Sequence, residues 1–523
     1  MAAVDQPRSI AIIGAGVAGL QALRALQQVP QVQTITVFER ADEVGGVWRE
    51  NYSGFGAQVK RDQYSFVELC GHSGLDTYPT GRQLKAHCDT YVKTFGLMPA
   101  IRTRTEVRFL QRCSHCWRIV YSETGSSETY TEQFDFVVLA VGNFSEKYVP
   151  EIPGSDVFAG SILHSSELQD EKLLRGRRVI VVGFGKSALD CFALASAEAE
   201  SVTLIARRPA WILPQRFLGL PLEWLASTRW FAKLVFPPYH NACLLVRLLG
   251  YIVLPLQTVL WWVLAPLVWC HFLLPWSMWP AYGLRWQLWH GHSVSICNAS
   301  KIKAVFRSAK THCIRGHISE MKSGSVLVQD SVQKQEKEIS ADVVVFATGY
   351  REAWSKLFDV KEAALLDPRK DGPDLYKLIL PTGDMTNLAF LGCVLSTCDI
   401  VTSFVQAEWL AGLLAGKFKY PSLQARERFS AKYRAWRLRF APTTTSTFLA
   451  TPSVHSYFDE LLSDLHCKTL FDRHHPTWKF RLLRQFLPLR ASNFSILHQK
   501  RGAKKPSLVA LRSESGTSDV SQV

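Results

Sequence analysis

The residues that point most directly to chemistry form a glycine-rich turn near the start of the chain. Gly14, Gly16 and Gly19 follow the apolar segment Ser9–Ile13, where a strand is expected to turn into a helix. In this G-x-G-x-x-G spacing the first glycine permits a tight turn, the second lets a pyrophosphate approach the backbone, and the third lets the helix pack closely on the strand. The N-terminus of that helix attracts phosphate. The turn therefore predicts a dinucleotide site.

A second turn of the same kind lies about 170 residues further along the chain. Gly183 and Gly185 follow the apolar segment Arg178–Val182, and Ala188 takes the place of the third glycine, with Ser187 just before it. One such motif alone is weak evidence. Two motifs in the same strand-to-helix context indicate two nucleotide cofactors with electron transfer between them.

The residues at the end of the next strand distinguish the two cofactors. Glu39 follows the predicted strand Thr34–Phe38, where a carboxylate can bind both hydroxyls of a ribose. Arg207 and Arg208 follow the predicted strand Ser201–Ile205, and guanidinium groups bind a 2′-phosphate that a carboxylate would repel. We therefore expect FAD at the first turn and NADPH at the second. A solvated strand end is the alternative interpretation of the two arginines.

Short motifs around the two turns resemble those of a known family. The segment Phe158–His164 is similar to the F-x-G-x-x-x-H signature of the class B flavoprotein monooxygenases, and it precedes the second turn by about 20 residues, as in that family. Over residues 8–210 and 335–465 the sequence resembles the flavin-containing monooxygenases in the broad sense. Three further motifs agree: Glu39-Arg40 followed by Gly45-Gly46-Val47-Trp48, Tyr78-Pro79-Thr80, and Ala347-Thr348-Gly349-Tyr350.

The resemblance implies an oxygenase. In the family, NADPH reduces FAD, the reduced flavin captures O2 as a C4a-hydroperoxide, and one oxygen atom passes to the substrate. We expect oxygenation of a small lipophilic substrate at nitrogen or sulfur. Two alternatives stay open: Baeyer–Villiger or decarboxylative oxygenation of a carbonyl compound, as in the plant auxin-forming branch, and a flavin oxidoreductase that does not oxygenate. Leu168 departs from the Baeyer–Villiger signature, which has tryptophan at that position.

Three polar residues are candidates for the catalytic site. Mammalian-type members of the family place an Asn near the flavin, and the corresponding residue here is Gln58, which keeps the amide on a longer arm. His164 and Asn143 lie at the two expected crossings between domains, so both are expected to position the domains rather than transfer protons. The residues expected to bind the cofactors are Gly14, Gly16, Gly19, Glu39, Arg40, Gly46, Val47, Trp48, Gly183, Gly185, Ser187, Arg207, Arg208 and Gly349.

The motifs predict an α/β protein with two Rossmann-like domains, in which an NADPH domain is inserted into a split FAD domain. We expect the strand Ala341–Phe346 to rejoin the first sheet. The expected divisions are 1–165 for the first part of the FAD domain, 166–335 for the NADPH domain with a hydrophobic insertion at about 211–290, 336–420 for the second part of the FAD domain, 421–498 for a basic helical region, and 499–523 for a disordered tail.

One apolar segment is unusual for a soluble enzyme. Residues 248–284 contain no Asp, Glu, Lys or Arg, and ten of the 16 tryptophans lie between Trp211 and Trp289. The run exceeds the ~20 residues that a membrane span needs. However, both of its ends must return to one domain, and four prolines between 255 and 280 would break a single straight helix. A re-entrant or surface-lying membrane insertion therefore fits better than a span. A buried helical subdomain or a lid is the alternative.

The charge of the chain agrees with a membrane surface as a partner. The net charge is +15, and residues 423–523 carry 17 Lys or Arg against 7 Asp or Glu. The stretch Trp478–Leu487 mixes cations with large apolar residues, as an amphipathic segment on anionic lipid does. A solvated basic face is the alternative. Nucleic acid is not expected as a partner, because no binding module is recognised.

The cysteines indicate a reducing compartment. The 12 cysteines follow no disulfide-like pattern, and no secretory signal precedes Ser9. We expect the cytoplasmic face of an intracellular membrane, such as the endoplasmic reticulum, or the cytoplasm. Cys113 and Cys116 have metal-ligand spacing, but no second pair matches them, so no metal site is expected.

Overall fold

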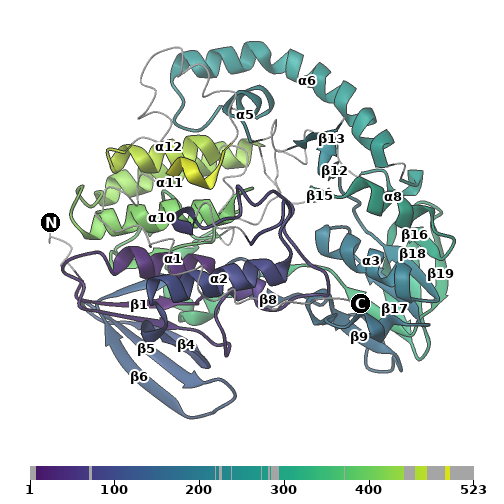
Figure 1. Ribbon diagram of the computed structural model, residues 1–523, viewed down its shortest axis with the longest axis horizontal. Coiled ribbons are helices and arrows are strands. Elements are labelled where there is room, and N and C mark those ends of the chain that lie inside the picture. The colour runs from purple at the N-terminus through teal and green to yellow at the C-terminus, as the bar shows by residue number, and fades with distance from the viewer. Residues whose placement is uncertain are drawn as a thin grey trace, which may run out of the picture.

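Two parallel β-sheets organise the chain (Figure 1). The computed structural model describes residues 7–69, 74–217, 219–222, 227–236, 238–272, 274–280, 283, 294–369, 372–440, 454–467 and 489–494. Each sheet is covered by helices on one face and by a small antiparallel sheet on the other. The expected α/β architecture with parallel sheets is confirmed. The amphipathic stretch 478–487 and the tail 499–523 lie outside the described residues.

The first sheet carries the first glycine turn. Its five parallel strands have the order β24-β7-β1-β2-β3. Ile13 of β1 lies opposite Phe38 of β2 and Leu139 of β7, so the C-terminal ends of the central strands meet at one edge. Such apolar runs suit a parallel sheet that is buried on both faces. The bounds are Ser9–Ile13 for β1, Thr34–Phe38 for β2, Ile101–Arg102 for β3, Phe136–Leu139 for β7 and Leu388–Phe390 for β24.

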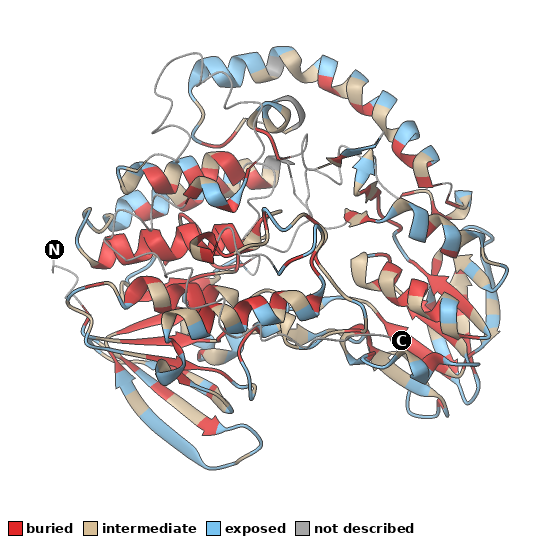
Figure 2. Ribbon diagram, viewed as in Figure 1, coloured by how far each residue is buried: buried red, intermediate tan, exposed pale blue. Residues whose placement is uncertain are grey.

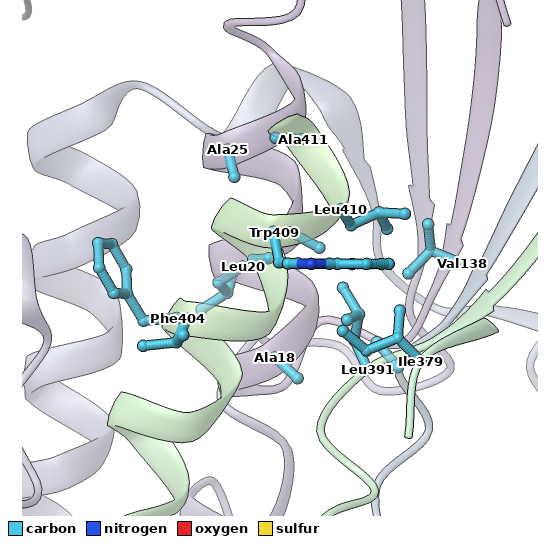
Figure 3. Packing of buried hydrophobic residues seen from close by; sticks show 14 of the residues in the cluster. Ala18, Leu20, Ala25, Val138, Ile379, Leu391, Phe404, Trp409, Leu410 and Ala411 are labelled. Carbon is cyan, nitrogen blue, oxygen red and sulfur yellow. The ribbon is translucent and has the colours of Figure 1, made fainter. Parts of the chain in front are cut away.

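Successive residues of these strands face two different cores. Ile12 and Val138 face helices α1, α2 and α10, whereas Ile13 and Leu139 face the antiparallel sheet β4–β6. Figure 3 shows side chains of α1 and α10 meeting beside Val138. The bounds are Val17–Leu26 for α1, Gly81–Phe95 for α2, Asp399–Leu414 for α10, Thr105–Arg112 for β4, Trp117–Glu123 for β5 and Thr129–Phe134 for β6.

The second sheet repeats this plan around the second glycine turn. Its parallel strands have the order β16-β11-β10-β20-β9. Val181 and Leu204 face helices α3 and α8, whereas Ile180 and Val344 face the antiparallel sheet β17–β19. The bounds are Ser161–His164 for β9, Arg178–Val182 for β10, Ser201–Ile205 for β11, Thr311–Ile314 for β16, Val343–Phe346 for β20, Lys186–Glu198 for α3, Ala299–Arg307 for α8, Gly316–Lys322 for β17, Ser325–Asp330 for β18 and Gln335–Ser340 for β19.

Two strands of the second sheet contradict the expected domain boundaries. The sequence predicts that β20 rejoins the first sheet, but β20 pairs with β10 and β9, and Phe346 lies opposite His164. β9 also belongs to the second sheet, although residues 1–165 are expected in the first domain. Both expectations are wrong because a short run of buried apolar residues suits either parallel sheet, and only long-range pairing decides between them. The second domain therefore extends from β9 to β20.

An ion pair fixes β20 beside β10. The Arg178 backbone N–H donates to the Asp342 carboxylate at 2.8 Å, and the Arg178 guanidinium donates to it at 2.6 Å and 3.1 Å. These hydrogen bonds lower the pKa of Asp342 to about 2. Asp342 precedes β20 by one residue, so the pair sets the register in which the strand enters the sheet.

The two chain crossings between the domains lie side by side. β8 (Glu146–Lys147), on the way into the second domain, pairs antiparallel with β21 (Tyr350–Arg351), on the way out. The chain then returns to the first domain and closes its sheet with β24. The split first domain with an inserted second domain is therefore present, with the return after residue 347 instead of 335.

The apolar insertion forms one long helix, α6 (Leu244–Phe272), that includes Pro255 and Pro266. The sequence predicts that the prolines break a straight helix. Instead the helix continues through both of them, and α6 curves along the edge of the molecule (Figure 1). In the second half of α6 one stripe, with Trp261 and Phe272, is buried, whereas residues 244–249 at its beginning are exposed all round the helix (Figure 2). The exposed apolar residues of α6 are Leu244, Leu245, Val246, Leu248, Leu249, Ile252, Leu256, Val259, Trp262, Val263 and Leu267.

Helix α6 connects the two halves of the molecule. Its end packs in the core of the second domain, where Trp269 contacts Trp211 with ring centroids 6.2 Å apart. The segment before α6 is held from the other side by α12 (Val454–Asp464), which packs on α10 of the first domain. Arg229 donates to Asp459 at 2.7 Å, and Asn241 donates to Glu460 at 2.9 Å. The expected basic region contributes this helix and α11 (Leu423–Phe440).

We predict that Gly160→Ala destabilises the protein. A Cβ at Gly160 would lie 2.4 Å from the carbonyl oxygen of Asp342, which accepts the Ser161 N–H in the β9–β20 ladder. Backbone must shift to relieve that overlap, at a cost of about 1–3 kcal/mol in the free energy of unfolding. Denaturant unfolding measures this loss. Gly324→Ala, where a Cβ meets nothing within 4 Å, is the matched control. Equal stability of the two variants would contradict the placement of β20 beside β9.

Candidate functional site

The first glycine turn lies directly against the neighbouring strand. Gly14 has φ +103°, and a Cβ there would lie 2.7 Å from the Ala140 carbonyl oxygen, just after β7. A Cβ at Gly19 would lie 1.9 Å from the Gly14 carbonyl oxygen, so α1 packs on the turn as the motif predicts. No larger residue fits at either position without backbone movement.

A second strip of backbone faces the same turn. A Cβ at Gly46 would lie 3.0 Å from the Gly16 Cα, so the two glycines approach each other without side chains between them. The Gly45 N–H donates to the Ala15 carbonyl oxygen at 3.0 Å. Val47 and Trp48 complete the short 3-10 helix η1 (Gly46–Trp48). These two bare backbones form a cradle of the kind that a pyrophosphate needs.

Glu39 ties this cradle to the sheet. It is buried just beyond the C-terminal end of β2, and its Oε2 accepts the Ala15 N–H at 2.7 Å while its Oε1 accepts the Ala41 N–H at 2.9 Å. Each carboxylate oxygen can accept a second hydrogen bond, so ribose hydroxyls fit here. Arg40 is exposed and donates to the Ser145 carbonyl oxygen at 2.8 Å. The residues of the first turn therefore fit FAD.

The second turn repeats the first. Gly183 has φ +133°, and a Cβ there would lie 2.5 Å from the Ala347 carbonyl oxygen, just after β20. A Cβ at Gly185 meets nothing within 4 Å, so the space before α3 is open. Arg207 and Arg208 follow β11 and are both exposed. Open space at a helix N-terminus with two guanidinium groups at the next strand end fits the pyrophosphate and 2′-phosphate of NADPH.

His164 joins the second sheet to the crossing. Its Nε2 lies 3.0 Å from the Gly349 carbonyl oxygen, and its Nδ1 lies 2.9 Å from the Ser166 Oγ. Because a carbonyl oxygen only accepts, the proton sits on Nε2, and Nδ1 accepts. Burial lowers the pKa of His164, which favours this neutral form. The expected positioning role at the crossing agrees with these contacts.

The other crossing residues lie around the same point. The Gly349 carbonyl oxygen also accepts the Tyr148 N–H at 3.0 Å. The Tyr350 ring packs against His164 and against Phe144, with ring centroids 5.0 Å and 5.6 Å away. Asn143, next to Phe144, is half-buried. The structure therefore brings Gly349 and His164 into contact and places Asn143 on the adjoining segment.

Gln58 and its neighbours connect the first domain to the second. The Gln58 Oε1 accepts the N–H of Ile296, in β15 (Ser295–Cys297) of the second domain, at 2.9 Å. The Tyr78 hydroxyl donates to the Gln215 carbonyl oxygen at 3.2 Å. Thr80, in the same motif as Tyr78, caps α2 by accepting the Gln83 N–H at 3.2 Å. Gln58 thus spans the joint, and its amide nitrogen is left to donate.

Sequence reasoning missed a cluster at the start of α3. The Tyr52 hydroxyl donates to Asp190 at 2.9 Å and hydrogen-bonds to Ser187, and Lys186 forms an ion pair with Asp190. Lys186 occupies a variable position of the glycine motif, which is the only local signal. Tyr52 comes from a distant part of the sequence, so its contact with α3 depends on the tertiary structure.

Cys113 and Cys116 close the turn between β4 and β5, where the Cys113 N–H donates to the Cys116 carbonyl oxygen at 2.9 Å. Among the described residues, no group of His, Cys, Asp and Glu is arranged to hold a metal ion. The pair therefore belongs to a hairpin of the first domain.

Comparisons with known proteins agree with this site. Residues 7–237 and 290–470 match the sequence profile of a family described as FMO-like, flavin-binding monooxygenase-like. The chain is 25% identical over 484 residues to flavin-containing monooxygenase 2 of Homo sapiens, covering 89% of this chain and 84% of that protein. It is 32% identical over 197 residues to senecionine N-oxygenase of Tyria jacobaeae, covering 35% of this chain and 43% of that protein.

A solved structure shares the fold. The crystal structure of OTEMO in complex with FAD and NADP has a TM-score of 0.68 at 16% identity, and the match covers 88% of this chain and 98% of that chain. The expected cofactors, FAD and NADPH, agree with the family and with the two glycine turns. The chain belongs to the flavin-binding monooxygenase-like family and is a flavin-dependent monooxygenase that uses NADPH.

Proposed function

We propose that this protein transfers one oxygen atom from O2 to a nitrogen or sulfur atom of a small lipophilic substrate. The observation that supports the proposal is the joint between the two nucleotide domains, which Gln58 and His164 hold together through hydrogen bonds. Bound FAD supplies the chemistry with O2, so the protein itself must bind, orient and exclude water. Similarity to an N-oxygenase supports the choice of nitrogen.

In this proposal His164 positions the joint and does not transfer protons. Its Nε2 proton is held by the Gly349 carbonyl oxygen, and burial lowers the pKa of its ring. Gln58 serves as an amide donor at the boundary between the domains, because its carbonyl oxygen is already used by Ile296. Both residues keep the joint closed, which limits the access of water to the flavin.

The Baeyer–Villiger alternative is less well supported. Leu168 takes the place of the tryptophan that ends that signature, and its side chain is fully buried in the core of the second domain. The Leu168 carbonyl oxygen accepts the Ser53 N–H at 2.8 Å, so this residue links the domains through its backbone. A tryptophan at this place would need additional room in a close-packed core.

We also propose that the enzyme works on a membrane surface. Ile252–Phe272 is the one helix among the described residues that is long and apolar enough to cross a membrane. Its inner stripe packs on the protein, so a surface-lying helix fits better than a span. Ile252 is 72% exposed and Trp262 is 77% exposed on its outer face. A row of exposed apolar residues with an interfacial tryptophan is typical of a helix that lies in a bilayer surface.

The product of the reaction tests the main proposal. We expect the purified enzyme, with NADPH in air, to convert a tertiary amine or a thioether to its N- or S-oxide, identified by mass spectrometry. Gly16→Val is the control, because a side chain between Gly16 and Gly46 closes the cradle and prevents FAD binding. An ester formed from a ketone, with no N- or S-oxide, would overturn the proposal. NADPH oxidation without any oxygenated product would indicate an oxidoreductase.

Substitution at the joint is expected to uncouple the reaction. His164→Ala and Gln58→Ala each remove a hydrogen bond worth about 1 kcal/mol, which changes the partition between product and H2O2 about five-fold. H2O2 released per NADPH consumed measures this change, with FAD content unchanged. His317→Ala, an exposed histidine on β17, is the matched control. Full coupling in both joint variants would contradict their roles.

Charge on the outer face of α6 is expected to release the enzyme from membranes. Ile252→Glu with Leu256→Glu removes two exposed apolar side chains, each worth about 1.5–3 kcal/mol if buried in lipid. Flotation with anionic vesicles should fall at least tenfold while FAD content stays the same. Gln333→Glu, exposed in the second domain, is the control. A wild-type enzyme that does not float with vesicles would contradict the proposal.

A further inference from the structure

A three-residue cluster at the start of α3 joins Lys186, at a variable position of the glycine motif, to Asp190 and to Tyr52. Lys186 is the first residue of α3, and its Nζ forms an ion pair with Asp190, one turn further along the helix. The Tyr52 hydroxyl donates to the same Asp190 oxygen at 2.9 Å. Tyr52 comes from the first domain, so Asp190 is shared between a residue of the coenzyme turn and a residue of the other domain.

These side chains are largely withdrawn from water. The side chain of Lys186 is 21% exposed and that of Asp190 is 14% exposed, while Tyr52 is buried. Burial and the nearby Asp190 raise the pKa of Tyr52, so its hydroxyl stays protonated and donates. A partly buried carboxylate and ammonium need partners, and here each has at least one.

The cluster adjoins the place where the coenzyme pyrophosphate fits. Gly185 caps α3, and the space beside it is open. A pyrophosphate there is close to the positive end of the helix, but also close to the Asp190 carboxylate. Lys186, within the glycine turn, is the cation that can offset the charge of the pyrophosphate. Its flexible four-carbon stem allows the ammonium to leave Asp190 and turn toward the helix N-terminus.

We propose that Lys186 is a ligand of the NADPH pyrophosphate, and that it forms an ion pair with Asp190 while the turn holds no coenzyme. On coenzyme binding the ammonium moves from the carboxylate to a phosphate oxygen, and Asp190 keeps the Tyr52 hydroxyl as its partner. No covalent bond changes. The proposal rests on the use of NADPH and assigns Lys186 a different contact from Arg207 and Arg208, which lie where the 2′-phosphate fits.

Two ligands separate these contacts. NADP+ carries both the pyrophosphate and the 2′-phosphate, whereas 2′-AMP carries the 2′-phosphate alone. Binding to the FAD-loaded protein is measured by calorimetry. Lys186→Met is expected to weaken NADP+ at least tenfold, the loss of one charged contact, and to leave 2′-AMP within twofold. Arg207→Gln with Arg208→Gln is expected to weaken both ligands. Lys301→Met, an exposed lysine on α8, is the matched control and should change neither.

Asp190 provides the sharper test, because Lys186→Met leaves a carboxylate that itself repels phosphate. Asp190→Asn releases Lys186 from its ion pair and keeps an acceptor for Tyr52, so NADP+ is expected to bind several-fold more tightly. The double variant Lys186→Met/Asp190→Asn has no unpaired charge, and because Asn removes the repulsion it is expected to bind NADP+ more tightly than Lys186→Met but still several-fold more weakly than wild type. Wild-type affinity in the double variant would overturn the proposal, since repulsion by Asp190 alone would then explain the single variant.

Two other outcomes also decide the matter. Equal weakening of NADP+ and 2′-AMP by Lys186→Met would overturn the proposal, because it indicates a general disturbance of the domain. Unchanged NADP+ affinity in Lys186→Met, with FAD content equal to wild type, would overturn it directly. A wild-type protein that binds neither ligand would instead contradict the use of NADPH, so the two failures are distinguishable.

Discussion

Both nucleotide sites depend on the same close contact between a glycine and a carbonyl oxygen. Gly14 lies against Ala140, just after β7, and Gly183 lies against Ala347, just after β20. In each domain the turn that receives a dinucleotide is therefore fixed to the chain as it leaves the neighbouring strand. These two exits are also the crossings between the domains. A movement of the chain at Ala140 or Ala347 therefore displaces the glycine turn packed against it, because no side chain lies between them.

The joint between the domains combines backbone pairing, hydrogen bonds and the Lys147–Glu167 ion pair. β8 and β21 pair side by side, and the Gly349 carbonyl oxygen accepts hydrogen bonds from Tyr148 and His164. Gln58 adds a contact with β15 on the other side of the joint. Such contacts hold the two domains in one orientation. Helix α6 and the C-terminal helices add a second, peripheral connection between the same two domains.

Much of the chemistry could be predicted from local sequence. The glycines of both turns, Glu39 and the pair Arg207 and Arg208 occur where strands end, and their spacing alone identifies two dinucleotide sites. The two cofactors could be predicted in this way because each glycine motif lies within one strand–turn–helix unit, so its spacing is visible in a short stretch of sequence.

Other features depended on contacts between distant residues. β20 could have entered either sheet, and its pairing with β10 depends on Asp342 and Arg178, which are far apart in sequence. The expected break in the apolar helix is absent at Pro255 and Pro266, and the second half of α6 packs in the core of the second domain through Trp261 and Phe272. The meeting of Tyr52 with Asp190 has no local signal either. The sequence by itself determined the two cofactor turns, because each glycine motif lies within a short stretch of the chain. Only the tertiary structure decided the domain boundary and the joint, because burial and long-range hydrogen bonds select among strands that are alike in sequence.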